Sequence, residues 1–242
     1  MGRILAISDM HGQHAMLVAL LNKIALQPDD KLIFMGDYID RGPHSKEVLE
    51  TVLSLRETHD ATLLMGNHEA IMLRAFTANH SKPWEHWITV CGGVATLESY
   101  GLSVADFDTT TLPLLKQLPT GHLLRKHLQA IETMGYYMAY EDVIFVHGGV
   151  DPQLPLAKTP ISTLLWIRKD FHTGYNGEKT IVFGHTPSYR LHGTKDNTDV
   201  YYGVNRIIGI DGGATFGGQL HCLDWTNKRV YSVQAKSCVA QS

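Results

Sequence analysis

Five short polar clusters contain the residue types that could do chemistry in this sequence. Each combines acids, histidines or an amide side chain with a nearby glycine. In chain order they are Asp9-Met10-His11, Gly36-Asp37-Tyr38-Ile39-Asp40-Arg41-Gly42, Gly66-Asn67-His68-Glu69, His147-Gly148 and Gly184-His185. Carboxylate, imidazole and amide ligands without thiolate suit a divalent ion such as Mn²⁺, Fe²⁺ or Zn²⁺. The clusters therefore predict a metal site, and the glycines let loop backbone pass close to it.

Each cluster follows a short apolar run that is typical of a buried strand. These runs cover residues 3–8, 31–35, 61–65, 143–146 and 180–183. Amphipathic helical spacing separates the first three runs, over residues 15–24 and 48–55. Alternating strand, polar loop and helix predicts an α/β fold, in which chemistry gathers at the carboxyl ends of the strands. Clusters far apart in the chain can therefore form one site.

The middle of the chain has a different pattern. Residues 71–133 are mostly helical and contain Trp84, Trp87 and a Gly92-Gly93 pair. We interpret this segment as a helical, cap-like insertion. Strand patterns resume at 136–140, a helix is predicted over 161–168, and Gly-rich turns from about 205 to 234 predict antiparallel hairpins. No repeat or low-complexity linker is present, so residues 1–242 are predicted to form a single domain.

The composition excludes several classes of protein. The chain has 242 residues, 44% hydrophobic and 19% charged, with a net charge of -3. This balance argues against disorder and gives no basic excess for nucleic acid. No apolar run is long enough for a membrane helix, and no secretory leader pattern is present. Three widely spaced cysteines (91, 222 and 238) predict free thiols. We expect a cytoplasmic protein; no pattern indicates an oligomeric state.

The motif order DxH, GDxxDRG, GNHE, H, GH resembles the calcineurin-like metallophosphoesterases. Within them it is similar to the phosphoprotein phosphatases, which remove phosphate from serine and threonine. The runs His86-Trp87-Ile88 and Trp166-Ile167-Arg168 are most similar to bacterial and phage-type members. The similarity extends from Asp9 to the Gly-rich tail. It implies two packed, mixed β-sheets flanked by helices, with a helical insertion.

The resemblance also implies a dinuclear metal centre. Mn²⁺ is the favoured ion, with Fe or Zn as alternatives. A hydroxide bridging the two ions would attack phosphorus directly and in line, without a phosphoenzyme. Asp37 would bridge the ions. The remaining ligands would be Asp9 and His11 for the first ion, and Asn67, His147 and His185 for the second.

Catalytic and substrate-binding roles follow from the same resemblance. His68 would protonate the leaving oxygen, and Asp40 would orient its ring. Arg41 and Arg168 would grip phosphate oxygens, and Asn67 would also contact substrate. Outside these motifs, Asp211 is interpreted as a turn residue, and the tryptophans, Trp166 included, as packing residues. Ten of the 14 histidines have no assignable role.

The favoured reaction is hydrolysis of phosphoserine or phosphothreonine in a protein or peptide. The alternative is symmetrical hydrolysis of a dinucleoside polyphosphate such as diadenosine tetraphosphate, which similar enzymes perform with the same motifs. Residues 71–133 contain too few basic residues to establish a polyphosphate channel. A non-catalytic metal-containing binding module is a third hypothesis. Retention of Asp37, Asn67, His68 and Arg41 argues against that third hypothesis.

Overall fold

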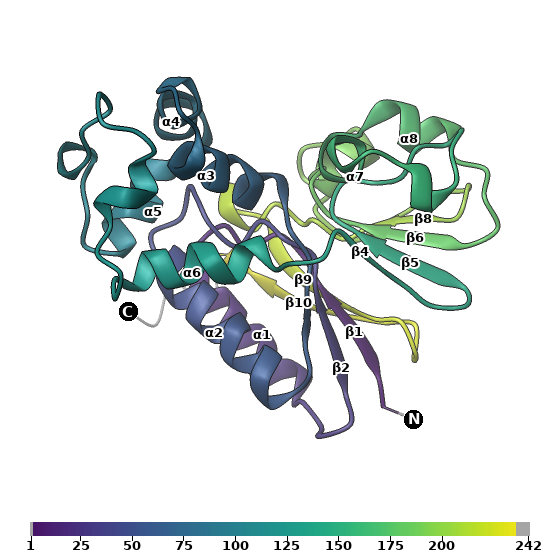
Figure 1. Ribbon diagram of the computed structural model, residues 1–242. Coiled ribbons are helices and arrows are strands. Elements are labelled where there is room, and N and C mark those ends of the chain that lie inside the picture. Colours follow the sequence, from purple (N-terminus) through teal and green to yellow (C-terminus); the bar gives the residue numbers. More distant parts are fainter. Residues whose placement is uncertain (1, 236–242) are drawn as a thin grey trace.

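Two mixed five-stranded β-sheets form the centre of the computed structural model, which describes residues 2–235 (Figure 1). The first sheet has the order β10-β9-β1-β2-β3 and the second the order β4-β5-β6-β8-β7. The first contains β1 (Ile4–Ile7), β2 (Lys31–Phe34), β3 (Thr62–Leu63), β9 (Gln219–Asp224) and β10 (Arg229–Gln234). The second contains β4 (Tyr137–Ala139), β5 (Val143–Val146), β6 (Thr180–Phe183), β7 (Tyr201–Tyr202) and β8 (Ile207–Gly209). The predicted fold class is confirmed.

Parallel pairing brings the polar clusters to common edges. In the first sheet β1, β2 and β3 run parallel, and in the second β5, β6 and β8 do so. The five clusters follow β1, β2, β3, β5 and β6, so their loops leave the sheets at the carboxyl ends of parallel strands.

The tail differs in part from the predicted antiparallel hairpins. Strands β9 and β10 do form such a hairpin, and β7 is antiparallel to β8. However, β8 pairs parallel with β6. The reason is that β7 runs opposite to β6 after helix α9 (Ser188–His192) and the loop that follows it. The chain therefore returns before β8 begins, and β8 runs in the same direction as β6.

Alternation along the strands builds three apolar layers. In β1, Leu5 and Ile7 join the cluster under the helices of the first sheet, whereas Ala6 joins the core that both sheets share. In β5, Phe145 points into that shared core and Val146 into the outer cluster of the second sheet. This is the period-two pattern of a strand that is buried on both faces. The shared core holds the sheets together and aligns the edges from which the polar loops emerge.

Helices cover the outer faces of both sheets. Helices α1 (His14–Ile24), α2 (Ser45–Thr58) and α6 (Leu123–Glu132) lie on the side of the first sheet (Figure 1). Helices α7 (Ile161–Trp166) and α8 (Lys169–Gly174) lie over the second. Short 3₁₀ turns occupy Leu156–Lys158 and Ala214–Phe216. No helix within residues 2–235 is long and apolar enough to cross a membrane. Cys91 and Cys222 are free and buried, and Cys238 lies outside the described residues.

The segment 71–133 is largely helical. It comprises most of α3 (Asn67–Thr77), then α4 (Lys82–His86), a π-helical turn (Trp87–Cys91), α5 (Gly93–Ser99), 3₁₀ turns (Val104–Asp106 and Leu114–Gln117) and α6. An aromatic cluster holds it together: the Trp84 ring lies 4.9 Å from Phe107 and 5.5 Å from Phe76, between ring centroids. Edge-to-face and tilted contacts at these distances stabilise aromatic pairs.

Candidate metal centre

The loops that carry the clusters adopt unusual backbone torsions. Five of their non-glycine residues have a positive φ. These are His11 (44°), Asp37 (52°), Asp40 (70°), Arg41 (69°) and His185 (62°). Such torsions cost on the order of 1 kcal/mol or more each and persist where surrounding contacts enforce them, which is common at functional sites.

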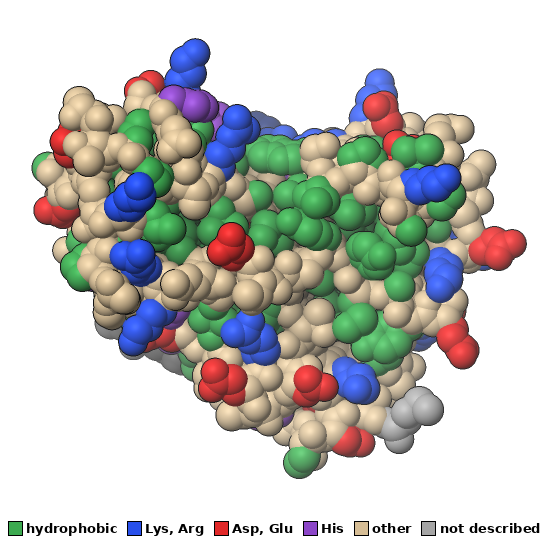
Figure 2. Space-filling model, viewed as in Figure 1, with side chains coloured by type: hydrophobic (Ala, Val, Ile, Leu, Met, Phe, Trp, Pro, Cys, Tyr) green, Lys and Arg blue, Asp and Glu red, His purple; other side chains and the backbone are tan. Residues whose placement is uncertain are grey.

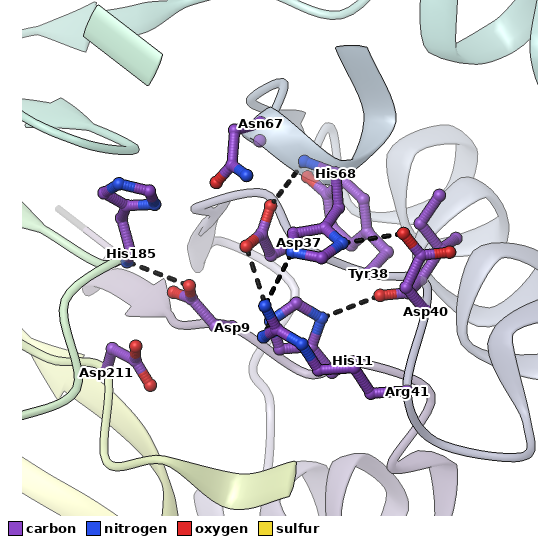
Figure 3. A network of polar contacts seen from close by, with 12 residues as sticks. Asp9, His11, Asp37, Tyr38, Asp40, Arg41, Asn67, His68, His185 and Asp211 are labelled. Atoms are coloured by element: carbon purple, nitrogen blue, oxygen red, sulfur yellow. Dashed lines mark hydrogen bonds and ion pairs between the residues drawn. The ribbon is translucent and has the colours of Figure 1, made fainter. Parts of the chain in front are cut away.

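The Asp37 carboxylate lies between two histidines. Its Oδ2 is 3.4 Å from His11 Nε2, and its Oδ1 is 3.4 Å from His147 Nε2. Two buried groups share this aspartate, His11–Asp37–His68 and Asp37–His147–His185, and the ligand atoms of each group lie within 4.8 Å of one another. The arrangement suits two metal ions bridged by one carboxylate. Figure 3 shows the side chains converging around Asp37.

The hydrogen-bond pattern of the histidines fits this donor set. The Nδ1 atoms of His11 and His147 lie 2.7 Å and 2.9 Å from the carbonyl oxygens of Ile39 and Met35. A carbonyl oxygen can only accept, so Nδ1 of each ring carries a hydrogen, and the Nε2 atom of each ring faces Asp37. The Nε2 atom of His11 also accepts from the Arg41 guanidinium. Acceptors that face one another are stabilised by a cation between them. A histidine that binds metal through one nitrogen typically donates from the other nitrogen to a carbonyl oxygen, as these two rings do. Burial lowers the pKa of His11, with His68 and Arg41 adding to the effect, which keeps its ring neutral.

Two further ligand atoms face the same region. The Asn67 Oδ1 atom lies 2.9 Å from His147 Nε2. His185 Nε2 is buried and has no hydrogen-bond partner in the described part of the chain. Burial also lowers the pKa of His185, so that this nitrogen offers a lone pair. A buried polar atom without a partner is costly, and a metal ion would satisfy it.

Buried carboxylates supply the compensating negative charge. Burial raises the pKa of Asp37 and of Asp211, and the neighbouring Asp9 raises both further. Asp9 accepts a hydrogen bond from the His185 backbone N–H at 2.8 Å (Figure 3). It also accepts one from the Ser8 hydroxyl at 2.8 Å. Three acids buried together repel one another unless cations offset their charge. The cluster therefore fits divalent ions.

Asp211 was underestimated by sequence reasoning. It does accept the Gly213 backbone N–H at 2.9 Å, as a turn residue would. It also lines the same cavity as Asp37. A signal was available, because Asp211 follows β8, the third parallel strand of the second sheet. The rule that chemistry gathers after parallel strands applies to it as it does to His147 and His185.

His68 and Asp40 lie together beside the metal ligands. His68 Nδ1 is 2.7 Å from Asp40 Oδ2, and the Arg41 guanidinium donates to His68 Nε2 at 2.8 Å. Asp40 Oδ1 accepts from Trp87 Nε1 at 2.9 Å and from the Thr96 hydroxyl at 2.7 Å. Burial raises the pKa of Asp40 to about 7, although these donors lower it. Trp87 is therefore a hydrogen-bond donor to Asp40 as well as a packing residue.

Glu69 shapes the loop that carries Asp37. Its carboxylate accepts the backbone N–H groups of Asp37 at 2.8 Å, Tyr38 at 2.9 Å and Gly66 at 2.9 Å. The side chain is fully buried, and burial raises its pKa to about 8. This role is not visible in the GNHE motif itself, because Asp37 and Tyr38 lie in the loop after another strand.

The two arginines, Arg41 and Arg168, line one cavity of about 270 Å³. Arg41 contacts His11 and His68 through its guanidinium and lies over the Phe216 ring, 5.3 Å from the centroid. Arg168 donates to the His185 carbonyl at 3.0 Å and to the Thr186 hydroxyl at 2.7 Å. A phosphate that entered the cavity would meet both guanidinium groups.

The cavity contains most of the expected site residues. Of these residues, its lining includes His11, Asp37, Arg41, Asn67, His68, Arg168 and His185. Asp9, Asp40 and His147 lie behind its wall, in contact with lining residues. Trp166, interpreted from sequence as a packing residue, is 47% exposed and lines the cavity with its ring edge-on to His185. Arg190 and Phe216 also line it and were not anticipated.

Comparison with known proteins identifies relatives over nearly the whole chain. The family model for calcineurin-like phosphoesterases matches residues 2–212. A bis(5'-nucleosyl)-tetraphosphatase PrpE of the asymmetrical type from Bacillus velezensis is 27% identical over 250 residues, covering 95% of this chain and 91% of its own. The protein of the same name from Bacillus subtilis strain 168 is 29% identical over 229 residues, covering 88% and 87%.

Solved structures show the same fold. A crystal structure provisionally assigned as a diadenosine tetraphosphatase aligns with a TM-score of 0.67 and 21% identity, covering 96% of this chain and 93% of that one. A serine/threonine phosphatase from Saccharomyces cerevisiae aligns with a TM-score of 0.59 and 14% identity, covering 96% and 79%. At these identities the likeness is one of fold alone.

Proposed function

Because the chain belongs to the calcineurin-like phosphoesterase family, we propose that it hydrolyses dinucleoside tetraphosphates asymmetrically, to a nucleoside triphosphate and a nucleoside monophosphate. The broader activity, metal-dependent phosphoester hydrolysis, follows from the family and from the two buried His/Asp groups. The observation that carries the narrower proposal is that relatives aligned over about nine-tenths of the chain are named for this reaction.

This proposal changes the substrate preference drawn from the motifs. The motif spelling favours a phosphoprotein, and the symmetrical dinucleotide cut was the alternative. The motif residues would form the parts of the site that bind phosphate and metal, and either substrate class would use these parts. What supports the dinucleotide class is similarity along the rest of the chain, where the remainder of the substrate would be recognised.

Asp37 has the central role in the proposed metal centre. When bound, divalent ions would neutralise phosphate oxygens and lower the pKa of water at the site. Asp37 would hold both ions, since each of its oxygens faces a different histidine. The other proposed ligands are Asp9, His11, Asn67, His147 and His185. Mn²⁺ is the proposed ion, and availability rather than this ligand set decides among Mn, Fe and Zn.

The remaining groups would bind phosphate and handle protons. A water molecule would lose a proton to solvent, and its oxygen would form the new bond to phosphorus. The anhydride bond would break, and the leaving phosphate oxygen would keep the electron pair and the negative charge. Arg41 and Arg168 would bind the oxygens that carry this charge. His68 would supply a proton to the leaving oxygen, with its ring held by Asp40 at 2.7 Å.

Parallel assays on three substrates test the proposal. Diadenosine tetraphosphate, a phosphoserine peptide and a chromogenic phosphate ester would be compared with Mn²⁺ and with a chelator. We expect the highest kcat/KM for the tetraphosphate, with ATP and AMP as products. A preference for the peptide by orders of magnitude would support a protein phosphatase instead. ADP as the sole product would indicate symmetrical cleavage, and no metal-dependent turnover would favour a binding module.

A further inference from the structure

A second cavity, of about 350 Å³, opens beside the metal cavity. Residues Ile71, His86 and Trp166 line both, so the two cavities adjoin each other. Arg74, His80 and Lys82, with His86, supply the polar side chains of its wall. We call this second cavity the basic groove.

The polar side chains of the basic groove are available to a ligand. Arg74, His80, Lys82 and His86 are all exposed. Among residues 2–235, no carboxylate forms an ion pair with Arg74 or Lys82. The nearby acid Glu85 instead accepts a hydrogen bond from the Ser81 hydroxyl. Figure 2 shows Lys, Arg and His side chains gathered at the upper left, where Figure 1 places α4.

The fold concentrates charge that is sparse in the sequence. Arg74 comes from the last turns of α3, and Lys82 and His86 come from α4. These two helices pack against each other. Their meeting places a small number of basic residues on one wall next to the metal centre, although the segment as a whole is not basic.

A third cavity provides an electrostatic contrast. It has a volume of about 590 Å³ and adjoins the metal cavity at Phe216, and Trp166 does not line it. Its charged lining consists of Asp196, Asp199 and Lys195. A polyphosphate carries several negative charges, so it is attracted to the basic groove and repelled by the two carboxylates of the third cavity.

Trp166 offers a surface for an aromatic ligand. Its side chain is 47% exposed and stands at the junction of the metal cavity and the basic groove. It packs edge-on against His185, with the ring centroids 5.9 Å apart. A partly exposed indole provides a face on which a nucleobase can stack.

We propose that the basic groove binds the triphosphate half of a dinucleoside tetraphosphate. Arg74 and Lys82 contact its phosphates, and Trp166 stacks against its base. The phosphorus under attack, next to the other nucleoside, then lies at the metal centre, which accounts for an asymmetrical cut. This inference rests on the proposed function.

The first test compares two substrates in matched variants. The variants are Arg74→Ala/Lys82→Ala, which removes two cations from the basic groove, and Lys195→Ala, which removes one exposed cation from the third cavity. For each, kcat/KM is measured for diadenosine tetraphosphate and for bis(p-nitrophenyl) phosphate with Mn²⁺. We expect the tetraphosphate-to-ester ratio to fall about tenfold or more in the double variant, as for loss of charge-assisted phosphate contacts. Lys195→Ala should leave the ratio within about twofold. An unchanged ratio in the double variant overturns the groove assignment.

The second test separates failure of the groove from failure of the proposed function. Inhibition of bis(p-nitrophenyl) phosphate hydrolysis by ATP, AMP and inorganic tripolyphosphate is measured at constant free Mn²⁺. In the wild type, ATP should inhibit more strongly than AMP, and Arg74→Ala/Lys82→Ala should remove this difference. Trp166→Ala should weaken inhibition by ATP about tenfold but leave inhibition by tripolyphosphate unchanged. If wild-type protein cleaves the ester but not the tetraphosphate, the proposed function fails. If the inhibition constant for ATP is the same in the wild type and in the double variant, the assignment of triphosphate binding to the basic groove is wrong.

Discussion

The carboxylate of Glu69 accepts the backbone N–H of Asp37 at 2.8 Å and thereby connects the start of α3 to the loop after β2. The same carboxylate accepts N–H groups of Tyr38 and Gly66. Gly66 has no room for a side chain, because a Cβ there would lie 2.3 Å from the Asp37 carboxylate. Glu69 is therefore a positioning residue for the proposed bridging ligand.

We predict that Glu69→Gln destabilises the protein and weakens metal binding. The new amide NH₂ would face backbone donors, which leaves buried N–H groups without an acceptor at a cost of about 1–3 kcal/mol. Urea unfolding and metal content after dialysis measure the two effects. Glu57→Gln, at an exposed position of α2, serves as the control and should change neither. Wild-type stability and metal content in Glu69→Gln would contradict this role.

Asp37→Asn should abolish binding of both metal ions. Each carboxylate oxygen faces a different histidine, and the neutral amide offers one weak oxygen ligand in place of two charged ones. Elemental analysis of protein purified with Mn²⁺ should show metal in the wild type and little in the variant. If the variant keeps two ions per chain, Asp37 is not the bridge.

His68→Asn should lower kcat far more on a phosphoserine peptide than on diadenosine tetraphosphate. A serine alkoxide is a poor leaving group that needs a proton, whereas a leaving phosphate is stable as an anion. We expect about 10²–10⁴-fold loss on the peptide, the range typical of general acid catalysis, and a clearly smaller loss on the anhydride. Metal content should stay close to wild type. His68 also lies in a group that could bind metal, and loss of metal from the variant would assign it that role instead.

Gly93→Ala should destabilise the protein although alanine is the better helix former. A Cβ at Gly93 would lie 2.5 Å from the Trp87 ring, the ring that donates to Asp40. Overpacking of this kind costs about 1–3 kcal/mol. Gly121→Ala is the matched control, because no atom lies within 4 Å of a Cβ there. Equal unfolding free energies in the two variants would show that the Trp87 contact tolerates the methyl group.

Stability should fall in mild acid partly because of His127, which contacts the Tyr100 hydroxyl through Nδ1. Burial lowers the pKa of His127 from 6.5 to about 4. Between these pH values the unfolded chain binds the proton more readily, so stability is present above pH 6.5 and is lost as the pH falls toward 4. With solvent screening the loss is about 1–2 kcal/mol.

His127→Gln should reduce this dependence. Urea unfolding at several pH values gives the unfolding free energy of wild type and variant. Groups common to both proteins contribute equally, so the difference between the two free energies at each pH reports on His127. His80→Gln, at an exposed position, should follow the wild type. Parallel pH curves for wild type and His127→Gln would contradict the assignment.

The local elements could be read from the sequence because each depends on near neighbours. Strands β5 and β6 were predicted with the bounds that the structure shows, since apolar runs between polar ends are local patterns. The polar clusters were found for the same reason. The predicted strand pairing in the tail was partly wrong, because the direction of β8 depends on the segment of chain that precedes it.

The sequence by itself determined the ligand types, their order and their positions at strand ends. The tertiary structure decided which atoms meet. Asn67 and His147 are 80 positions apart, and Trp87 and Asp40 are 47 apart. The roles of Glu69 and Asp211, and the convergence of Arg74 and Lys82 beside Trp166, also depend on contacts between separate elements. The physical reason is that burial, hydrogen-bond partners and local charge are properties of a packed neighbourhood, and packing is set by the meeting of both sheets and their helices.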